Sequence, residues 1–250
     1  MKKIFKQLIQ YYLKILTKIV IWRHKPVVIA IAGTTNKTFV KEVILDELGR
    51  CPDIRGNPKS FNTEIGLPLA VLFLPSGYSS MFRWVDVLLT GTCVSIFSRD
   101  FPKVLVLEMG TDRKGDMKYL LSMVKPTIAI ITNIDRNFPD TGATLDDIAF
   151  ELSFLTQSIP ENGAVVLNGE DLRVRRLKEK TKAKVVLYGT DKKCGARISD
   201  IEILPFGQRF KFDYQNSKQS MEIKRHGRHN INALVIAKIV DKELRRIEDR

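Results

Sequence analysis

The segment GTTNKT, residues 33–38, has the residue types and the position of a phosphate-binding loop. The β-branched run VVIAIA precedes it and apolar residues at helical spacing follow it, so the segment connects a strand to a helix. Backbone amides at the beginning of a helix attract anions. In phosphate loops the lysine reaches the terminal phosphates and the next hydroxyl binds Mg²⁺. The candidate phosphate-binding residues are Gly33, Thr34, Thr35, Asn36, Lys37 and Thr38.

This loop departs from the pattern G-x-x-x-x-G-K-[ST], because Ile31 and Asn36 occupy its two glycine positions. Asparagine adopts left-handed backbone conformations more readily than most residues, so the turn can form without the second glycine. Its side chain would nevertheless crowd a phosphate lying against the loop. Two interpretations follow: a nucleotide site, or an ordinary turn between a strand and a helix.

A second candidate residue is Glu108, which ends the apolar run VLVLE. Ligands of open α/β sheets bind at the carboxyl ends of the strands, and Glu108 is predicted to lie at that edge. Mg²⁺ takes one or two protein oxygens and completes its shell with phosphate and water. Thr38 and Glu108 together therefore predict a Mg²⁺ site. The alternative is a carboxylate that caps the turn after the strand.

The elements that must position these residues alternate between strands and helices. Apolar runs predict buried strands, and the segments between them have helical spacing, which indicates an α/β fold with a doubly wound, mostly parallel sheet. Residues 196–223 instead contain short alternating runs that predict a small antiparallel β edge. The predicted strands are residues 27–33, 103–110, 127–134, 163–171 and 184–189, and the predicted helices are about 37–48, 115–124, 144–157, 171–180 and 230–247.

Residues 1–25 are predicted to form an N-terminal amphipathic helix, and residues 26–250 one domain. Apolar residues recur at spacings of three and four, and lysines interrupt them, so neither a membrane span nor a signal peptide is expected. The helix can pack on the domain or lie in a membrane interface. Residues 79–98 predict a helix that is buried or faces a partner. The apolar positions of the first helix are Ile4, Leu8, Tyr11, Tyr12, Ile15, Ile19 and Trp22.

The charge and the cysteines bound the partners and the compartment. The net charge is +13, and nine lysines and arginines precede the first acidic residue, Glu42, which predicts an anionic neighbour. A membrane face or a phosphorylated substrate fits this charge. Nucleic acid is not expected, because no basic recognition helix or aromatic-basic interleaving is present. Three widely spaced cysteines favour a reducing cytoplasm. If the first helix lies in a membrane interface, the expected location is the inner face of the membrane.

Five stretches of the chain resemble, in order, the central ATP-binding domain of the Mur ligases, which add amino acids to the peptidoglycan precursor. The resemblance is greatest to the member that adds D-alanyl-D-alanine. It implies an ATP-dependent amide ligase that forms an acyl phosphate from a UDP-muramoyl-peptide, with ATP and Mg²⁺ as cofactors. The stretches are GTTNKT, FNTEIGLPLAVL, LEMGTDRKGDMKYL, IPENGAVVLNGED and GRHNINAL.

The resemblance also implies roles for individual residues. Lys37 holds the phosphates, and Thr38 and Glu108 hold the first Mg²⁺. Asn230 or Asn232 meets the adenine, since GRHNINAL is one residue shorter than the family pattern. Residues expected in the loop that faces the substrate are Asn62 and Glu64.

The chain also departs from the family at positions that matter for catalysis. The family's histidine falls at Phe138 or a neighbour, and its carbamylated lysine falls where Glu151 and Leu152 stand. Both are ligands or supports of the second Mg²⁺ in the family. The uridine-binding amino-terminal domain and the carboxy-terminal ligase domain are not expected within these 250 residues. The chain is therefore interpreted as a truncated, partly degenerate ligase that works with a partner protein, or as an inactive nucleotide-binding or scaffold protein.

Overall fold

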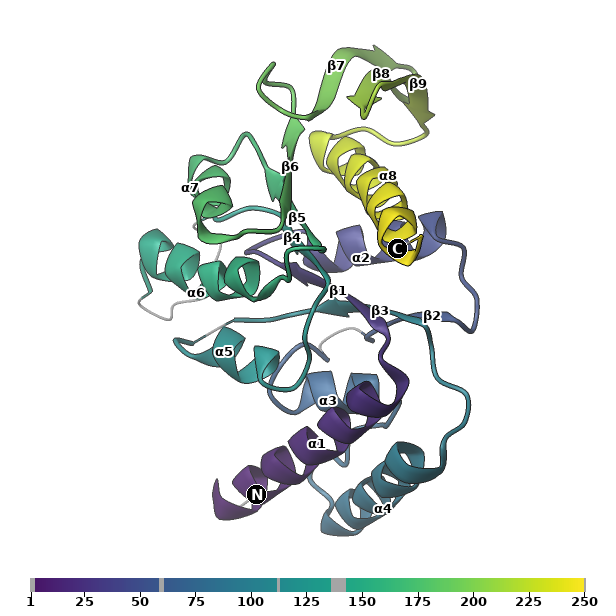
Figure 1. Ribbon diagram of the computed structural model, residues 1–250, viewed down its shortest axis with the longest axis vertical. Coiled ribbons are helices and arrows are strands. Elements are labelled where there is room, and N and C mark those ends of the chain that lie inside the picture. The colour runs from purple at the N-terminus through teal and green to yellow at the C-terminus, as the bar shows by residue number, and fades with distance from the viewer. Residues whose placement is uncertain (1–2, 59–60, 112, 136–142, 250) are drawn as a thin grey trace.

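The structure is a computed structural model, and it describes residues 3–58, 61–111, 113–135 and 143–249. A single mixed sheet runs through these residues in the order β2-β3-β1-β4-β5-β6-β7-β8-β9 (Figure 1). Neighbouring strands from β2 to β7 are parallel, and β7, β8 and β9 pair antiparallel. The strands are β1 (Val27–Ala32), β2 (Ile54–Gly56), β3 (Val104–Glu108), β4 (Ile128–Ile131), β5 (Ala164–Asn168), β6 (Lys184–Gly189), β7 (Ala196–Leu204), β8 (Gly207–Tyr214) and β9 (Ser217–Ile223).

The central strands form because their apolar residues are covered on both sides, as parallel sheets require. In β1, Val28 and Ala30 belong to one core cluster, whereas Ile29 and Ile31 belong to the other. Successive side chains of a strand point to opposite faces, so each strand contributes to both cores. The prediction of a doubly wound, mostly parallel sheet with a small antiparallel edge is confirmed.

Helices cover both faces of the sheet. Helices α2 and α8 pack together over one face, and the remaining helices lie over the other (Figure 1). Each predicted helix is present within a few residues of its expected ends, although the segment 171–180 divides into a short α-helix and a 3₁₀ turn. The helices are α1 (Lys3–His24), α2 (Lys37–Glu47), α3 (Gly66–Val71), α4 (Met81–Phe97), α5 (Asp116–Leu121), α6 (Leu145–Ser158), α7 (Leu172–Arg176), η1 (Leu177–Lys180) and α8 (Arg228–Glu248).

Two short elements were not predicted. Strand β2 is only three residues long and contains Arg55 and Gly56, so no alternation marks it as a strand. Helix α3 carries Pro68 in its first turn, a position that tolerates proline because the amide there needs no helical acceptor. Both elements lie between residues 33–38 and β3 in the sequence, and they bring Asn57 and Asn62 toward the end of β3.

The N-terminal helix packs through a different face from the one that its sequence pattern emphasised. Ile9, Leu13, Leu16 and Val20 are buried against the domain. The predicted apolar positions, from Ile4 to Trp22, are exposed to different extents on the opposite side. Helix α1 is therefore apolar on both faces. No helix in the described ranges is long and apolar enough to cross a membrane.

Candidate functional site

The loop 33–38 lies where the order of the strands reverses. Strand β1 lies between β3 and β4, and the chain leaves its carboxyl end to enter α2 (Figure 1). The parallel register pairs Ile31 with Glu108 and Ala32 with Ile131. Three strand ends therefore meet around the loop. Such switch points are the usual ligand sites of open α/β sheets.

The backbone of the loop has the shape that the sequence prediction required. Asn36 is left-handed, with φ of 63°, and precedes the first residue of α2. Gly33 has φ of 132°, and a Cβ atom there would lie 2.2 Å from the Thr132 hydroxyl. No side chain fits at Gly33 without displacing Thr132. Asn36 therefore replaces a glycine at a position that asparagine tolerates, while Gly33 occupies one that only glycine fits.

Polar groups of the loop face the beginning of α2. The Lys37 ammonium donates hydrogen bonds to the carbonyls of Gly33 (2.8 Å) and Thr34 (3.4 Å), so the side chain folds over the loop. Among the described residues, the backbone amides of Asn36 and Thr38 have no acceptor. The positive end of the α2 dipole adds to their field. An anion that reaches the loop thus meets a lysine and unpaired amides together.

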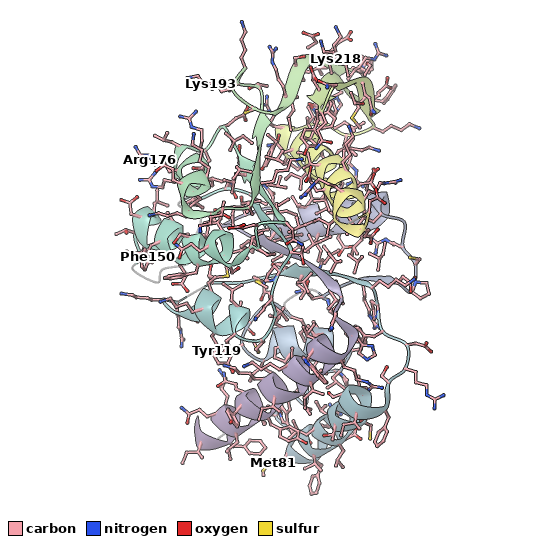
Figure 2. All side chains as sticks on the ribbon, in the orientation of Figure 1. Met81, Tyr119, Phe150, Arg176, Lys193 and Lys218 are labelled. Atoms are coloured by element: carbon pink, nitrogen blue, oxygen red, sulfur yellow. The ribbon has the colours of Figure 1, made fainter. Side chains whose placement is uncertain are left out.

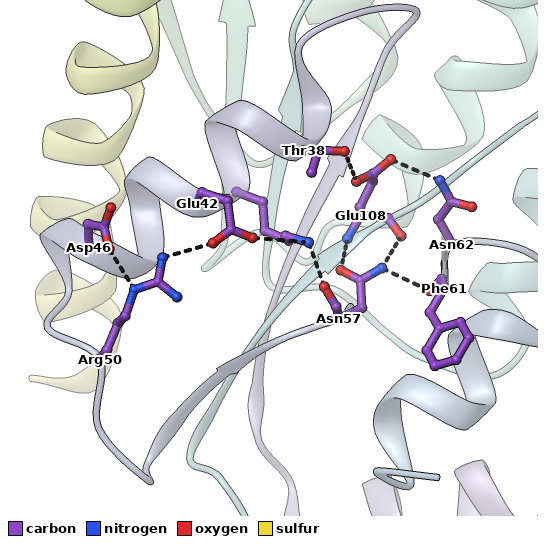
Figure 3. A network of polar contacts seen from close by, with 9 residues as sticks. Thr38, Glu42, Asp46, Arg50, Asn57, Phe61, Asn62 and Glu108 are labelled. Atoms are coloured by element: carbon purple, nitrogen blue, oxygen red, sulfur yellow. Dashed lines mark hydrogen bonds and ion pairs between the residues drawn. The ribbon is translucent and has the colours of Figure 1, made fainter. Parts of the chain in front are cut away.

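The central contact of the site joins Thr38 to Glu108 (Figure 3). The Thr38 hydroxyl donates to Glu108 Oε2 at 2.7 Å, and Asn62 Nδ2 donates to Oε1 at 2.8 Å. Glu108 is only 5% exposed. Both partners of its side chain are neutral, and no lysine, arginine or histidine of the described residues forms an ion pair with it. A buried carboxylate without a cation is costly, which makes this position suited to a bound cation.

The main chain of Glu108 is fixed by Asn57. Asn57 Oδ1 accepts from the Glu108 amide at 2.9 Å, and its Nδ2 donates to the carbonyls of Glu108 (3.2 Å) and Phe61 (2.8 Å). The buried Lys41 ammonium donates to the Asn57 carbonyl and lies 3.5 Å from Glu42 Oε1 (Figure 3). These contacts connect α2, β2 and β3 behind the carboxylate. They hold it in place before any ligand arrives.

The other side of the loop is fixed from the end of β4. Asn133 accepts from the Thr34 amide through its carbonyl (2.9 Å) and from the Thr35 amide through Oδ1 (3.2 Å). The Thr132 hydroxyl donates to the Thr35 carbonyl at 2.8 Å. Thr34 and Thr35 thus use their amides within the protein, and the sequence analysis missed this role of Asn133. A signal was available, because Asn133 lies near the end of the predicted strand 127–134, just as Glu108 lies near the end of the predicted strand 103–110.

The two asparagines considered for adenine lie at the beginning of α8, beside α2. The rings of Phe39 and His229 are 5.6 Å apart, which joins the first turns of these helices. Asn230 Nδ2 donates to the His226 carbonyl at 2.7 Å, so it fixes the turn before α8. In contrast, Asn232 Oδ1 is buried and has no hydrogen-bond partner among the described residues. An unsatisfied buried acceptor needs a donor, which makes Asn232 the better candidate of the two.

The residues considered for the substrate loop separate in the structure. Asn62 reaches Glu108, as described above, whereas Glu64 Oε1 accepts from Lys6 Nζ and Gln10 Nε2 of α1, each at 3.0 Å. Partial burial raises the pKa of Glu64, but the hydrogen bond from Lys6 and nearby positive charge outweigh it, so the pKa is below its ordinary value. Glu64 thus ties the N-terminal helix to the segment that carries Asn62.

Glu151 and Leu152, which stand where the family has its carbamylated lysine, have structural roles here. Leu152 is buried in the apolar core. Glu151 Oε1 accepts from the backbone amides of Gly115 (3.0 Å) and Met117 (2.8 Å) at the beginning of α5, and its buried Oε2 has no partner among the described residues. Phe138 lies outside the described residues. Within those residues no cluster of three or more histidine, cysteine or acidic side chains is placed to hold a metal.

The chain matches one known protein family over most of its length. The model of the Mur ligase middle domain matches residues 91–240, which is more than half of the chain. The protein belongs to the Mur ligase middle domain family. The match includes β3 with Glu108, the helix of Glu151 and Leu152, and the first turns of α8.

Two relatives of this Mur ligase middle domain are UDP-N-acetylmuramoyl-tripeptide–D-alanyl-D-alanine ligases. A UDP-N-acetylmuramoyl-tripeptide–D-alanyl-D-alanine ligase of Mycobacterium tuberculosis is 27% identical over 164 residues, covering 66% of this chain and 28% of that protein. The Buchnera aphidicola ligase of the same name is 26% identical over 214 residues, which cover 85% of this chain and 41% of that protein. The chain thus spans less than half of these relatives.

A similar fold is present in solved structures. The MurF ligase of Thermotoga maritima in complex with ADP superposes with a TM-score of 0.74 at 17% identity. The superposition covers 94% of this chain and 49% of that one. Almost the whole described chain therefore has the fold of about half of a Mur ligase.

Proposed function

We propose that this Mur ligase middle domain binds ATP with Mg²⁺ and supplies the nucleotide half of an ATP-dependent ligase of peptidoglycan precursor synthesis. The observation that carries the proposal is the 2.7 Å contact of the Thr38 hydroxyl with the buried Glu108 carboxylate. Thr38 directly follows Lys37 in the loop. Two of its relatives are named as ligases of UDP-N-acetylmuramoyl-tripeptide and D-alanyl-D-alanine. The reaction would proceed through an acyl phosphate of the precursor.

Asn36, Lys37 and Thr38 each have a defined task in this proposal. Lys37 leaves the carbonyls of Gly33 and Thr34 and turns toward the terminal phosphates, while the amides of Asn36 and Thr38 donate to phosphate oxygens. Thr38 and Glu108 would hold Mg²⁺, which neutralises charge that develops on the transferred phosphoryl group. Asn57 and Asn62 keep the carboxylate aimed at the loop. Positioning and charge neutralisation are what phosphoryl transfer needs from a protein.

The muramoyl-peptide and the amino acid need surfaces beyond this domain. Since the chain spans less than half of the relatives compared, we infer that a partner protein or a further segment brings in the amine and closes over the nucleotide. Asn62 lies between Glu108 and the segment tied to α1, so the carboxylate substrate would approach from that side. Three unpaired cysteines fit a cytoplasmic location, where ATP is available.

A second candidate function is nucleotide binding without amide formation. It is favoured by the burial of Leu152 in the apolar core and by the two hydrogen bonds that Glu151 Oε1 accepts from α5, because the lysine that supports the second metal in the family is replaced here by residues that stabilise the fold. In that case the protein would act as a nucleotide-dependent binder or scaffold beside the ligases of cell-wall synthesis. Both candidates require the phosphate loop, and only the first requires phosphate release.

The first experiment is a calorimetric titration of ATP into the protein, with Mg²⁺ and with a chelator, for the wild type and Lys37→Ala. We expect micromolar binding that requires Mg²⁺ and that weakens by about 100-fold, or roughly 2.8 kcal/mol, in Lys37→Ala. Lys25→Ala, at the other end of β1, is the matched control and should bind as the wild type does. Absence of binding at millimolar ATP would contradict both candidate functions.

The second experiment measures phosphate release from ATP in the presence of a UDP-muramoyl-tripeptide and D-alanyl-D-alanine. Release that depends on the tripeptide supports the ligase. ATP binding without such release, also when a bacterial lysate fraction is added to supply a partner, assigns the binder. The Lys37→Ala variant serves as the blank for contaminating ATPases in both arms.

A further inference from the structure

The outward face of α1 is apolar although the fold does not need it to be. Ile4, Leu8, Tyr11, Ile15 and Trp22 follow one another at spacings of four, three, four and seven residues and are exposed, Trp22 by 76%. The opposite face of the same helix already forms the contact with the domain. Single exposed apolar residues are ordinary, but a continuous stripe of them indicates a contact surface.

Helix α4 has a stripe of the same kind. Phe82, Val85, Leu89 and Ile96 are exposed at helical spacing, and Phe82 is 90% exposed. Its other face buries Trp84, Val87 and Gly91. The sequence predicted a buried or partner-facing helix over this segment, and the exposed stripe is what a partner-facing helix requires.

The two stripes form one surface because α1 and α4 pack side by side (Figure 1). The Tyr12 hydroxyl and the Thr92 hydroxyl are 2.7 Å apart in an exposed contact between the helices. Leu8 and Ile15 lie one turn to either side of Tyr12, and Leu89 and Ile96 lie one turn to either side of Thr92. The apolar side chains of both helices therefore border the same seam. We call this the α1–α4 surface, from Leu8 to Trp22 and from Phe82 to Ile96.

The charges around this surface are mostly positive. The first acidic residue of the chain is Glu42, so α1 carries none, and Asp86 is the acidic residue of α4 beside Arg83. Lys18 lies one turn from both Ile15 and Trp22 and is exposed. It forms no ion pair with any residue that the structure describes. Apolar and aromatic side chains with lysines among them are typical of helices that lie in a membrane interface.

We propose that the α1–α4 surface binds the surface of an anionic membrane, with both helices parallel to the bilayer plane. The apolar stripes would enter the boundary between headgroups and acyl chains, and Lys18 and Arg83 would contact lipid phosphates. Neither helix crosses the bilayer, since no described helix is long and apolar enough. The α1–α4 surface lies at the end of the molecule away from β7–β9, and Met81 points outward there (Figure 2).

A second copy of the chain suits this surface less well than lipid does. Each chain has a net charge of +13, so a dimer would bring two strongly positive molecules together. Anionic lipid headgroups instead offer opposite charge over the whole area. Glu64 joins Lys6 and Gln10 of α1 to the segment of Asn62, so a membrane-bound α1 would hold the candidate site close to the bilayer.

The test is co-sedimentation of the full chain with vesicles of phosphatidylcholine and phosphatidylglycerol at 7:3. We expect the double variant Phe82→Ser/Leu89→Ser to bind at least about fivefold more weakly than the wild type, because it removes two apolar anchors. Both side chains are exposed, so the domain should keep its thermal stability. The matched control is Phe206→Ser, whose side chain is 89% exposed in the turn between β7 and β8, and it should bind as the wild type does.

Tryptophan fluorescence provides a second readout at the other helix. The protein has two tryptophans, of which Trp22 is exposed and Trp84 is buried with its indole donating to the Tyr78 carbonyl at 3.0 Å. Anionic vesicles should shift the emission of Trp22 to the blue, and brominated lipids should quench it. Trp22→Phe should still sediment with the vesicles but lose both signals.

Three results would overturn the proposal. The first is that the wild type stays in the supernatant with anionic vesicles. The second is that Phe82→Ser/Leu89→Ser binds vesicles as strongly as the wild type does, since binding would then come only from a general attraction of positive charge. A concentration-dependent dimer in analytical ultracentrifugation, broken by the same double variant in a protein that ignores vesicles, would assign the surface to a second copy. None of these results bears on ATP binding, so the two proposals fail separately.

Discussion

Two buried glutamates, Glu108 and Glu151, have the same exposed fraction of 5% and opposite roles. Glu108 accepts hydrogen bonds from the side chains of Thr38 and Asn62 beside the phosphate loop. Glu151 accepts them from backbone amides at the beginning of α5. The first arrangement leaves a carboxylate without a cationic partner among the described residues, as the proposed Mg²⁺ site requires, and the second uses a carboxylate to complete the fold. Burial alone therefore does not identify a functional acid, but the origin of its donors does.

The largest change in stability should come from placing the family's lysine in α6, the helix that carries Glu151. Leu152→Lys places an ammonium group in the apolar core and should lower the free energy of unfolding by about 4 kcal/mol, without adding phosphate release. Leu152→Met, which keeps the volume, should cost less than about 1.5 kcal/mol. Chemical denaturation measures both. A stable Leu152→Lys variant that gains ATPase activity would show that α6 still faces a metal site.

On the Glu108 side, Glu108→Gln should weaken Mg²⁺-dependent ATP binding by about 100-fold, or roughly 2.8 kcal/mol. The same change should leave the nucleotide-free protein as stable as the wild type or slightly more stable, because it removes a buried charge that lacks a cationic partner. Calorimetry and thermal unfolding on one preparation give both numbers. A strong loss of stability with unchanged ATP affinity would reverse the roles of the two glutamates.

For Glu151, truncation should act on stability alone. Glu151→Ala leaves the amides of Gly115 and Met117 without their acceptor and should cost about 2 kcal/mol. Glu151→Gln keeps one acceptor oxygen and should cost less than half of that. ATP affinity should stay within about twofold in both variants, which corresponds to roughly 0.4 kcal/mol. A tenfold loss of affinity in Glu151→Gln would instead make this carboxylate part of the site.

Glu243 is a third buried glutamate, and it differs from the other two because Lys184 and Arg246 form ion pairs with it. Burial raises the pKa of Glu243, but hydrogen bonds from Lys184, Tyr214 and Arg246 outweigh it, so the pKa lies below its ordinary value of 4.5. A lowered folded-state pKa stabilises the protein above pH 4.5, and this stabilisation is lost as the pH falls through the folded-state value.

The expected measurement for Glu243 is a pH series of thermal unfolding against Glu243→Gln. The variant should be less stable than the wild type by about 1.5 kcal/mol at neutral pH, with a constant difference down to about pH 5.5. Below pH 4.5 the difference should shrink, because the wild type then protonates and the variant does not. A difference that grows toward acid pH would mean that Glu243 is protonated in the folded protein at neutral pH.

Much of the fold and one half of the site were predictable from the sequence. The strands β1, β3, β4 and β5 consist almost entirely of apolar residues. In a chain where such runs alternate with segments of helical spacing, a buried parallel strand is the structure that they favour. The pairing of Glu108 with Thr38 followed from the rule that parallel strands end at one edge of the sheet. The left-handed backbone at Asn36 followed from the residue type.

The rest depends on long-range contacts that no local pattern encodes. Asn57 and Asn133 hold Glu108 and residues 33–38 through contacts between segments that are distant in the sequence. Asn57 lies outside every predicted element, and the position of Asn133 near a strand end does not reveal which groups it contacts. The exposed stripe of α1 was visible as periodicity, but a helix that is apolar on two faces does not reveal which face packs. The packing was decided by α3 and α4, and α3 was itself not predicted.

The most direct test of the account is the Mg²⁺ dependence of ATP binding in Thr38→Val and Thr38→Ser. Valine keeps the shape of threonine and removes the hydroxyl that lies 2.7 Å from Glu108, whereas serine keeps the hydroxyl. Calorimetry should show that Mg²⁺ strengthens ATP binding to the wild type and to Thr38→Ser by at least about tenfold, or roughly 1.4 kcal/mol, and that Thr38→Val has lost this gain. Equal Mg²⁺ dependence in all three proteins would contradict the assignment of Thr38 and Glu108 as the cation site.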